Sequence, residues 1–158
     1  SNTTGSFISD DLYVITSMSA ATSNWIVATS FNFSFPSNSI VSGIILEIER
    51  NGNDAVLDTN VNLIVNNTGG GNNKALTSVL WPATDSSALY GGNTDTWGLT
   101  LNSANVTSPL FGVRFRVTAA DLQTANVDYI LMTVDYIDPA ISQAPNTQNA
   151  SSLSMMLI

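Results

Sequence analysis

The sequence predicts an all-β protein: a single antiparallel β-sandwich, jelly-roll-like, with an extended C-terminal tail. Three observations support this prediction. Apolar and polar residues alternate with a period of two in several segments, turn residues recur about every ten positions, and no segment keeps the 3.6-residue period of an amphipathic helix. Short strands separated by such turns are typical of sandwiches and jelly rolls. The length of 158 residues suits one domain with its own core.

The first half of the chain contains two strongly alternating segments. In "WIVATSFNFSF" (25–35) the predicted inward face comprises Trp25, Val27, Thr29, Phe31, Phe33 and Phe35. Pro36 would end this strand because proline cannot donate a ladder hydrogen bond. In "IVSGIILEIERNGN" (40–53) the predicted inward residues are Ile40, Ile44, Leu46 and Ile48. Glu47 and Glu49 would point outward, and "RNGN" would turn the chain.

Three further strands follow in the second half. The segment "TNVNLIVNN" (59–67) directs Val61, Leu63 and Val65 inward, and "LFGVRFRVTA" (110–119) does so with Phe111, Val113, Phe115 and Val117. The segment "ANVDYILMTVDYID" (125–138) is apolar on both faces in its middle, as expected of a central or interface strand. Between them, "AADLQTA" (119–125) is expected to form one helical turn. The outward Arg114 and Arg116 are expected to oppose Glu47 and Glu49 as cross-strand pairs.

The composition changes after the sandwich, which we assign to residues 1–138. Residues 139–158 begin with "PAISQAPNTQNASS", which has two prolines and no charge, so we expect an extended tail without a core of its own. The tail ends in an apolar group: Leu153, Met155, Met156, Leu157 and Ile158. Flexible apolar side chains fill irregular grooves well. We therefore expect this tail to dock on a partner or a neighbouring subunit.

Charge and composition exclude several classes of function. The net charge is −8, and only four residues are Lys or Arg, so the clustered cations that nucleic acids and anionic membranes require are missing. No apolar run reaches the eighteen or so residues of a membrane span. Cysteine is absent, so disulfides and thiolate chemistry are excluded. A low content of charge with abundant Ser, Thr and Asn favours an extracellular or particle-bound β-protein.

The chemistry of a catalytic site is also poorly represented. Histidine is absent, which excludes Ser-His-Asp triads and imidazole metal sites. Two carboxylate pairs remain, Glu47 with Glu49 and Asp85 with Asp95, but neither lies in a motif of a glycosidase. The Asn- and Asp-rich segments are typical of turns as much as of calcium loops. We therefore expect no enzymatic activity, no metal and no cofactor.

The stretch "YGGNTDTWGL" (90–99) admits two interpretations. Its glycines permit unusual backbone angles, and Trp97 is of the right size to plug one end of a sandwich, which favours a structural corner. The alternative is a sugar-binding platform formed by Trp81, Tyr90, Asp95 and Trp97. The structural interpretation is preferred, and the sugar site is kept as the alternative.

Several stretches together resemble a known module. They are "SNWIVATSFNFSFPSNSIVSGIILEIERNG", "NNKALTSVLWPATDSSALYGGNTDTWGLT", "FGVRFRV" and "VDYILMTVDYID". This series resembles a β-sandwich (jelly-roll-like) module of tailed-phage virion structural proteins and of some bacterial surface proteins. The resemblance covers about residues 24–138 and implies the fold more specifically than a function. It does not extend to the tail.

The resemblance implies a non-enzymatic virion structural protein. The roles it suggests are a capsid decoration or cement protein, or a head or tail appendage subunit of a tailed phage, on the virion surface. The implied partner is the major capsid protein or another virion protein, and a homo-oligomer, first of all a trimer, would match a repetitive lattice. The alternatives are a carbohydrate- or receptor-binding module of a fibre or cell surface, and a subunit of an extracellular filament.

Overall fold

A computed structural model of the chain describes residues 13–19, 21–139, 146–151 and 154–157. These residues form ten strands and one short helix. The elements in chain order are β1 (Val14–Ser19), β2 (Ile26–Thr29), β3 (Ile40–Asn51), β4 (Val56–Val65), β5 (Thr68–Gly70), β6 (Ser86–Gly92), α1 (Ser103–Val106), β7 (Gly112–Ala119), β8 (Leu122–Ile137), β9 (Asn146–Ser151) and β10 (Ser154–Leu157).

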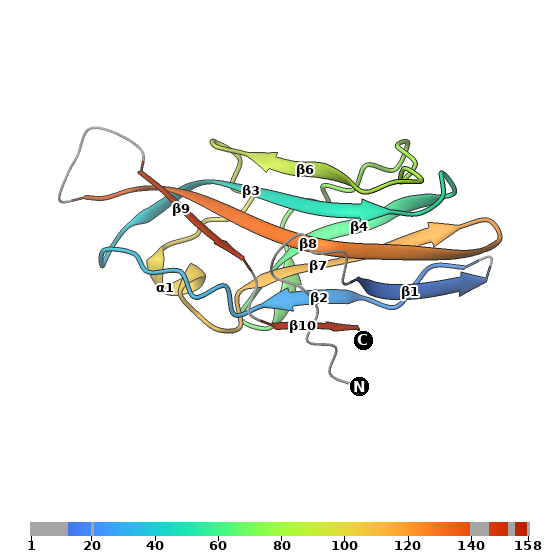
Figure 1. Ribbon diagram of the computed structural model, residues 1–158. Helices are drawn as coiled ribbons and strands as arrows, with labels where there is room; N and C mark the ends of the chain where they lie inside the picture. The colour runs from blue at the N-terminus through green and yellow to red at the C-terminus, as the bar shows by residue number, and fades with distance from the viewer. Residues whose placement is uncertain (1–12, 20, 140–145, 152–153, 158) are drawn as a thin grey trace.

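The strands form two antiparallel sheets that pack face to face. The first sheet has the order β1-β8-β3-β6, with β9 also paired to β8, and the second has the order β10-β2-β7-β4-β5. Without β9 and β10, the orders 1-8-3-6 and 2-7-4-5 are those of an eight-stranded jelly roll built from two Greek keys. Figure 1 shows β8 running along the molecule beside β3. The predicted all-β sandwich is therefore confirmed.

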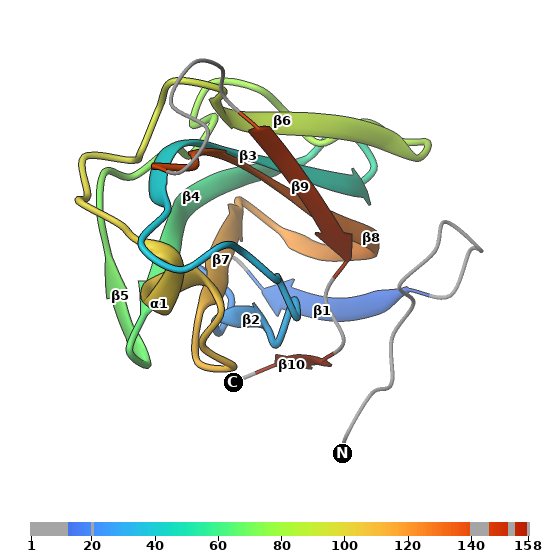
Figure 2. The same ribbon diagram turned by 90° about the vertical axis from the view of Figure 1, so that its left-hand side faces the viewer.

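The core lies between the two sheets and contains most of the residues predicted to face inward. Those confirmed as buried are Phe31, Phe33, Ile44, Leu46, Ile48, Val61, Leu63, Phe111, Val113, Phe115 and Val117. Phe35 and Val65 are partly buried against them. Helix α1 closes one end of the sandwich (Figure 2), where its Val106 joins the core. The period-two pattern thus identified the facing surfaces of β3, β4 and β7.

The inward face predicted for residues 25–35 was wrong for the first part of that segment. Ile26 and Ala28 are completely buried, so Trp25, Val27 and Thr29 lie on the other side of the strand. The alternation changes phase after β2 because Ser30 and Asn32 adopt positive φ angles of 62° and 55°. These two residues reverse the direction of the side chains without a glycine or proline to mark the change.

Two smaller expectations also need correction. Ile40 is 57% exposed and Val41 is buried in its place, because a bulge between Val41 and Gly43 shifts the register of β3. Residues 119–125 do not form a helical turn but the hairpin between β7 and β8. The helix lies instead at α1, where Asn102 and Asn105 form a reciprocal capping box.

The expected pairs between glutamates and arginines do not form within the chain. Glu47 and Glu49 belong to β3 in the first sheet, whereas Arg114 and Arg116 belong to β7 in the second. Each pair alternates with buried residues, so each projects from the outer face of its own sheet. The two pairs therefore point away from each other on opposite sides of the sandwich.

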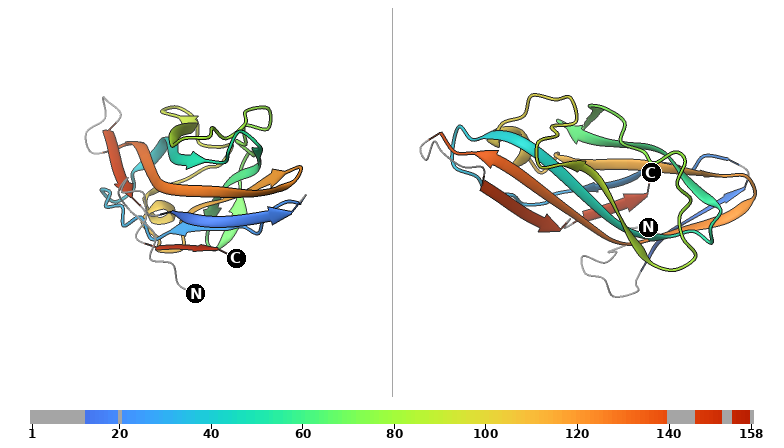
Figure 3. Two further views of the ribbon diagram at one scale, coloured as in Figure 1. Left: turned by 45° about the vertical axis from the view of Figure 1, so that its right-hand side comes forward. Right: turned by 90° about the horizontal axis from the view of Figure 1, so that it is seen from above.

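Part of the C-terminal tail adds strands to the chain's own sheets. Strand β9 pairs with residues 131–136 of β8, and β10 pairs with β2 (Figure 3). An extended polar segment satisfies its backbone groups in this way, and it covers strand edges that would otherwise be open. Met155, Met156 and Leu157 belong to β10, whereas Leu153 and Ile158 lie outside the described residues. Docking of the tail on a partner remains a prediction.

Candidate functional site

The corner at residues 90–99 is held by internal contacts. Trp97 is completely buried, and its indole Nε1 donates a hydrogen bond of 3.0 Å to the carbonyl of Ile44. Its backbone N–H donates to Asp95 Oδ1 over 2.8 Å, and Asp95 forms an ion pair of 2.5 Å with Lys74. The hydrogen bond from Lys74 holds the pKa of the Asp95 carboxyl below its usual value. The stretch is thus a packed corner in which Asp95 is a structural anchor.

A second polar cluster lies inside the core around Asp58. Asp58 Oδ1 pairs with Arg50 over 2.5 Å and accepts a hydrogen bond of 2.7 Å from Trp81 Nε1. Asp58 Oδ2 accepts hydrogen bonds from Tyr90 Oη at 3.0 Å and from the backbone N–H of Leu76 at 2.9 Å. The guanidinium of Arg50 lies 4.7 Å from the Trp81 ring centroid. We call Arg50, Asp58, Trp81 and Tyr90 the Asp58 hub.

In the Asp58 hub, Trp81 Nε1 and Tyr90 Oη both donate hydrogen bonds to Asp58, so these polar atoms are not free to bind a sugar. Trp81, Tyr90 and Trp97 are all buried, so none of their rings is available to stack on a pyranose. Burial, followed by the charge of Asp58, raises the pKa of the Tyr90 phenol far above its usual value. The residues of the proposed platform therefore support the fold.

Sequence reasoning missed Arg50 and Asp58, although the alternation contained a signal for both. Arg50 continues the inward series Ile44, Leu46 and Ile48, and Asp58 follows the buried Val56 at the same spacing. Two opposite charges at inward positions on consecutive strands predict a buried ion pair. The turn signal "RNGN" concealed this pattern, because it suggested that β3 ended before Arg50.

The outer face of the second sheet carries a cluster of a different kind, which we call the arginine face: Trp25, Arg114 and Arg116. The two guanidinium carbons lie 4.3 Å and 4.7 Å from the centroid of the Trp25 ring. Arg116 Nε donates a hydrogen bond of 2.7 Å to Asn60 Oδ1. Neither arginine forms an ion pair within the described part of the chain. A small hollow of about 140 Å³ adjoins the cluster.

Arg114 occupies a fitted position in this face. A Cβ atom on Gly69 would lie 2.0 Å from Arg114 Cζ, so the absence of a side chain in β5 makes room for the guanidinium. Arg114 Nε is buried and has no hydrogen-bond partner among the described residues. The hollow is lined by Trp25, Val27, Ile64, Asn67, Gly69 and Arg114. The arginine face thus combines an apolar floor with two cations.

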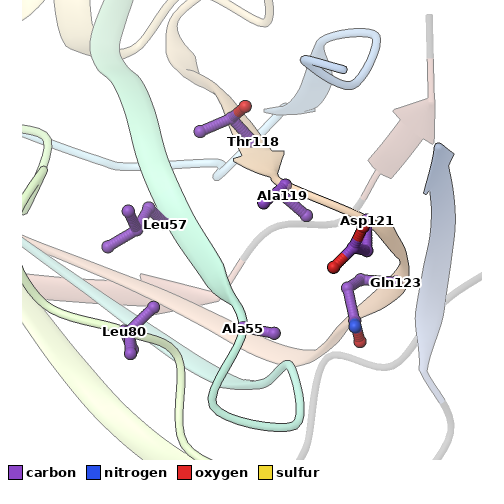
Figure 4. Close-up of a pocket in the computed structure, with 8 residues that line it drawn as sticks. Ala55, Leu57, Leu80, Thr118, Ala119, Asp121 and Gln123 are labelled. Carbon is purple, nitrogen blue, oxygen red and sulfur yellow. The ribbon is translucent and has the colours of Figure 1, made fainter. Parts of the chain in front are cut away.

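A larger groove of about 490 Å³ lies where the β7–β8 hairpin approaches the start of β4 (Figure 4). Its apolar side comes from Leu57 of β4 and from Leu80 in the segment before β6. Asp121 and Gln123 contribute the polar groups from the hairpin. The groove contains a single carboxylate, so it lacks the two facing carboxyl groups of a glycosidase.

The described residues contain no group of three or more His, Cys, Asp and Glu side chains placed to hold a metal ion. Among the helices of the described part of the chain, none has the length and apolar character needed to cross a membrane. Comparison with known proteins found no matching family model, curated protein or solved structure.

Proposed function

We propose that the chain is a non-enzymatic structural protein of a virus particle, a capsid decoration protein or a head or tail appendage subunit of a tailed phage. Its partner is the major capsid protein or another virion protein, and its place is the surface of the particle. The jelly-roll strand order supports this proposal because the fold is common in viral capsid proteins. The resemblance of residues 24–138 to phage virion modules points in the same direction.

The observation that carries the proposal is the position of β10. This strand is the outermost of its sheet and pairs with β2 in the register Ser154–Thr29 to Leu157–Ile26. A terminal strand at a sheet edge makes backbone hydrogen bonds that the edge of a neighbouring subunit can equally supply. In the particle, β10 leaves its own β2 and joins a neighbour, which fixes the protein to the lattice.

Truncation of the chain after Ser151 tests this role. The full-length protein is expected to sediment with particles purified from the natural source in a density gradient, and the truncated protein is expected to stay at the top. A cooperative thermal unfolding transition of the truncated protein is the control which shows that its sandwich is still folded. Equal particle occupancy of both proteins would contradict the role of β10, and absence of the full-length protein from particles would contradict the proposed function.

The carbohydrate-binding alternative loses its support because Trp81, Tyr90 and Trp97 are buried. A glycan array with a Trp97→Ala variant as the comparison remains its direct test, and we expect no glycan to bind. The filament alternative predicts long polymers of this chain in negative-stain micrographs.

A further inference from the structure

The two outer faces of the sandwich carry opposite charges. On the first sheet, Glu47 and Glu49 alternate with the buried Leu46 and Ile48 and therefore project outward from β3. On the second sheet, Arg114 and Arg116 alternate with Val113, Phe115 and Val117 in the same way. Neither glutamate forms an ion pair within the residues that the structure describes, and the arginines have none either.

The other two cations of the protein are already neutralised. Arg50 pairs with Asp58 in the core, and Lys74 pairs with Asp95 at the corner. Arg114 and Arg116 are thus the remaining cations of a chain whose net charge is −8. Both of these cations lie beside one tryptophan. This acidic protein therefore has one localised binding site for carboxylates.

We propose that the arginine face binds the outer face of the first sheet of a second copy of this chain, with Arg114 and Arg116 against Glu47 and Glu49. We call that second surface the glutamate face, and it comprises Glu47, Glu49, Leu89 and Leu131. The contact does not depend on the proposed virion role.

The spacing of the charges fits this contact. Each pair is separated by two residues along one strand, which corresponds to about 7 Å for both pairs. The sheets of two copies can therefore stack with both arginines opposite both glutamates. Glu47 is held in place by a hydrogen bond of 2.6 Å from Ser87 Oγ, and Arg114 is held over Gly69.

Apolar residues accompany the charges on both surfaces. In the first sheet, Leu89 of β6 and Leu131 of β8 are the register partners of Glu47, and Leu89 is 62% exposed. On the arginine face, Trp25 and Val27 border the hollow. Contact between these surfaces removes apolar area from water and strengthens the ion pairs by excluding solvent.

A second copy fits the arginine face better than a small molecule does. The hollow of about 140 Å³ is smaller than the roughly 300–1,000 Å³ of typical ligand pockets. A sugar would need the face of Trp25, where the two guanidinium groups already lie. Carboxylates on a flat surface need neither a deep pocket nor a free aromatic ring.

The contact is heterologous, because it joins different surfaces of the two copies. Such contacts form a closed ring when the rotation between neighbours closes, and an open filament when it does not. Copies would therefore associate head to tail, and a trimer is one of the rings that satisfy this geometry.

Sedimentation velocity of the full chain is the first test. We expect concentration-dependent association, with a Kd at least about tenfold weaker at about 500 mM NaCl than at about 50 mM, because salt screens exposed charges. A wild-type protein that remains monomeric at about 1 mM in low salt would overturn the proposal. Association that is independent of salt would do the same.

Charge reversal identifies the two faces. The Arg114→Glu/Arg116→Glu variant has two acidic faces, and the Glu47→Arg/Glu49→Arg variant has two basic faces, so each alone is expected to be monomeric. An equimolar mixture is expected to associate again, because the acidic face of one variant meets the basic face of the other. A mixture of two folded variants that stays monomeric would refute the pairing. The control is Asp54→Arg/Asp121→Arg, which changes the charge by the same amount as the basic variant but at two exposed loop positions. This control variant is expected to associate normally.

A pair of glycine variants tests the arginine face without changing charge. Gly69→Ala displaces Arg114, whereas a Cβ on Gly70 meets no atom closer than 3.9 Å. We expect Gly69→Ala to weaken association and Gly70→Ala to leave it unchanged, with near-ultraviolet circular dichroism confirming the fold of both. Equal association of the two would contradict the role of Arg114.

If the arginine reversal does not fold, Glu47→Gln/Glu49→Gln and the glycine pair decide the question. Binding of polyglutamate or an acidic glycan to a protein that does not self-associate would assign this face to a foreign ligand instead.

Discussion

Arg50 and Asp58 form an ion pair inside the hydrophobic core, with Nη1 and Oδ1 separated by 2.5 Å and side chains that are 3% and 1% exposed. The pair joins β3 to β4 and is surrounded by Trp81 and Tyr90. Charges at such positions are costly to bury, and each is tolerated only because the other is present. The Asp58 hub therefore makes the stability of the whole sandwich depend on one carboxylate.

Removal of this carboxylate is expected to destabilise the protein strongly. In Asp58→Asn, the amide no longer neutralises Arg50, which leaves a buried cation without a counter-charge. We expect the free energy of unfolding in urea to fall by about 3–5 kcal/mol. Asp54→Asn, at an exposed turn position, is the matched control and should change the free energy of unfolding by less than about 0.5 kcal/mol. Similar values for the two variants would show that the ion pair contributes nothing.

The raised pKa of Tyr90 predicts loss of stability at alkaline pH. The folded chain keeps this phenol protonated, whereas in the unfolded chain it ionises near its usual pKa of about 10. Its contribution to stability is therefore complete below about pH 10 and decreases as the pH rises further. The measurement is the melting temperature of the wild type and of Tyr90→Phe from about pH 8 to 11.5. The difference between the two proteins isolates the contribution of Tyr90, because both share all other titrating groups.

We expect the wild type to be more stable than Tyr90→Phe near neutral pH, because the phenol donates a hydrogen bond to Asp58. The difference should shrink above about pH 10, by up to about 1.4 kcal/mol for each pH unit. Parallel curves for the two proteins across this range would mean that Tyr90 does not control the alkaline transition.

Two adjacent glycines test the corner. Gly91 has a φ of +80°, and a Cβ there would lie 2.2 Å from the carbonyl oxygen of Ile44, whereas Gly92 has open space out to 3.9 Å. Gly91→Ala is expected to cost at least about 1–3 kcal/mol of unfolding free energy from backbone strain, and Gly92→Ala well under 1 kcal/mol. Chemical denaturation measures both. Equal costs would indicate that the chain turns here without using the positive φ of Gly91.

Truncation after Ser151 tests the pairing of β10 in the isolated protein. Loss of this four-residue strand should lower the free energy of unfolding by about 1–2 kcal/mol, because few backbone hydrogen bonds are lost. Amide hydrogen exchange should accelerate along β2, which loses its neighbour. The opposite edge at β5 is an internal control and should be unaffected. Unchanged protection of β2 would show that β10 does not cover it in solution.

Most of the fold follows from the alternation of side chains. In β3, β4 and β7, period two identified the inward faces because those strands are covered on one side only. The prediction failed where the backbone departs from regular geometry. Ser30 and Asn32 adopt positive φ angles, and the bulge at Val41–Gly43 adds a residue to β3. No local pattern of residue types marks these departures, because tertiary packing selects them.

The candidate sites were harder to predict because they depend on which strands become neighbours. Trp97 was expected to plug a corner of the sandwich, and it is buried there. Trp81 is buried as well, and its hydrogen-bond partner is Asp58, 23 residues earlier in the chain. Arg114 and Glu47 were expected to meet across one sheet. They lie in different sheets instead, because the jelly-roll order places β3 beside β8 and β7 between β2 and β4.

One edge of strand β8 is covered by two strands, β1 and β9, each of which is shorter than β8. Strand β1 covers its residues 122–127 and β9 covers residues 131–136, so segments near the two chain ends share that edge end to end. A protease that removes either segment would uncover an apolar central strand, and exposed strands of this kind seed aggregation. Degradation from either end would therefore turn the folded protein into a nucleus for insoluble deposits.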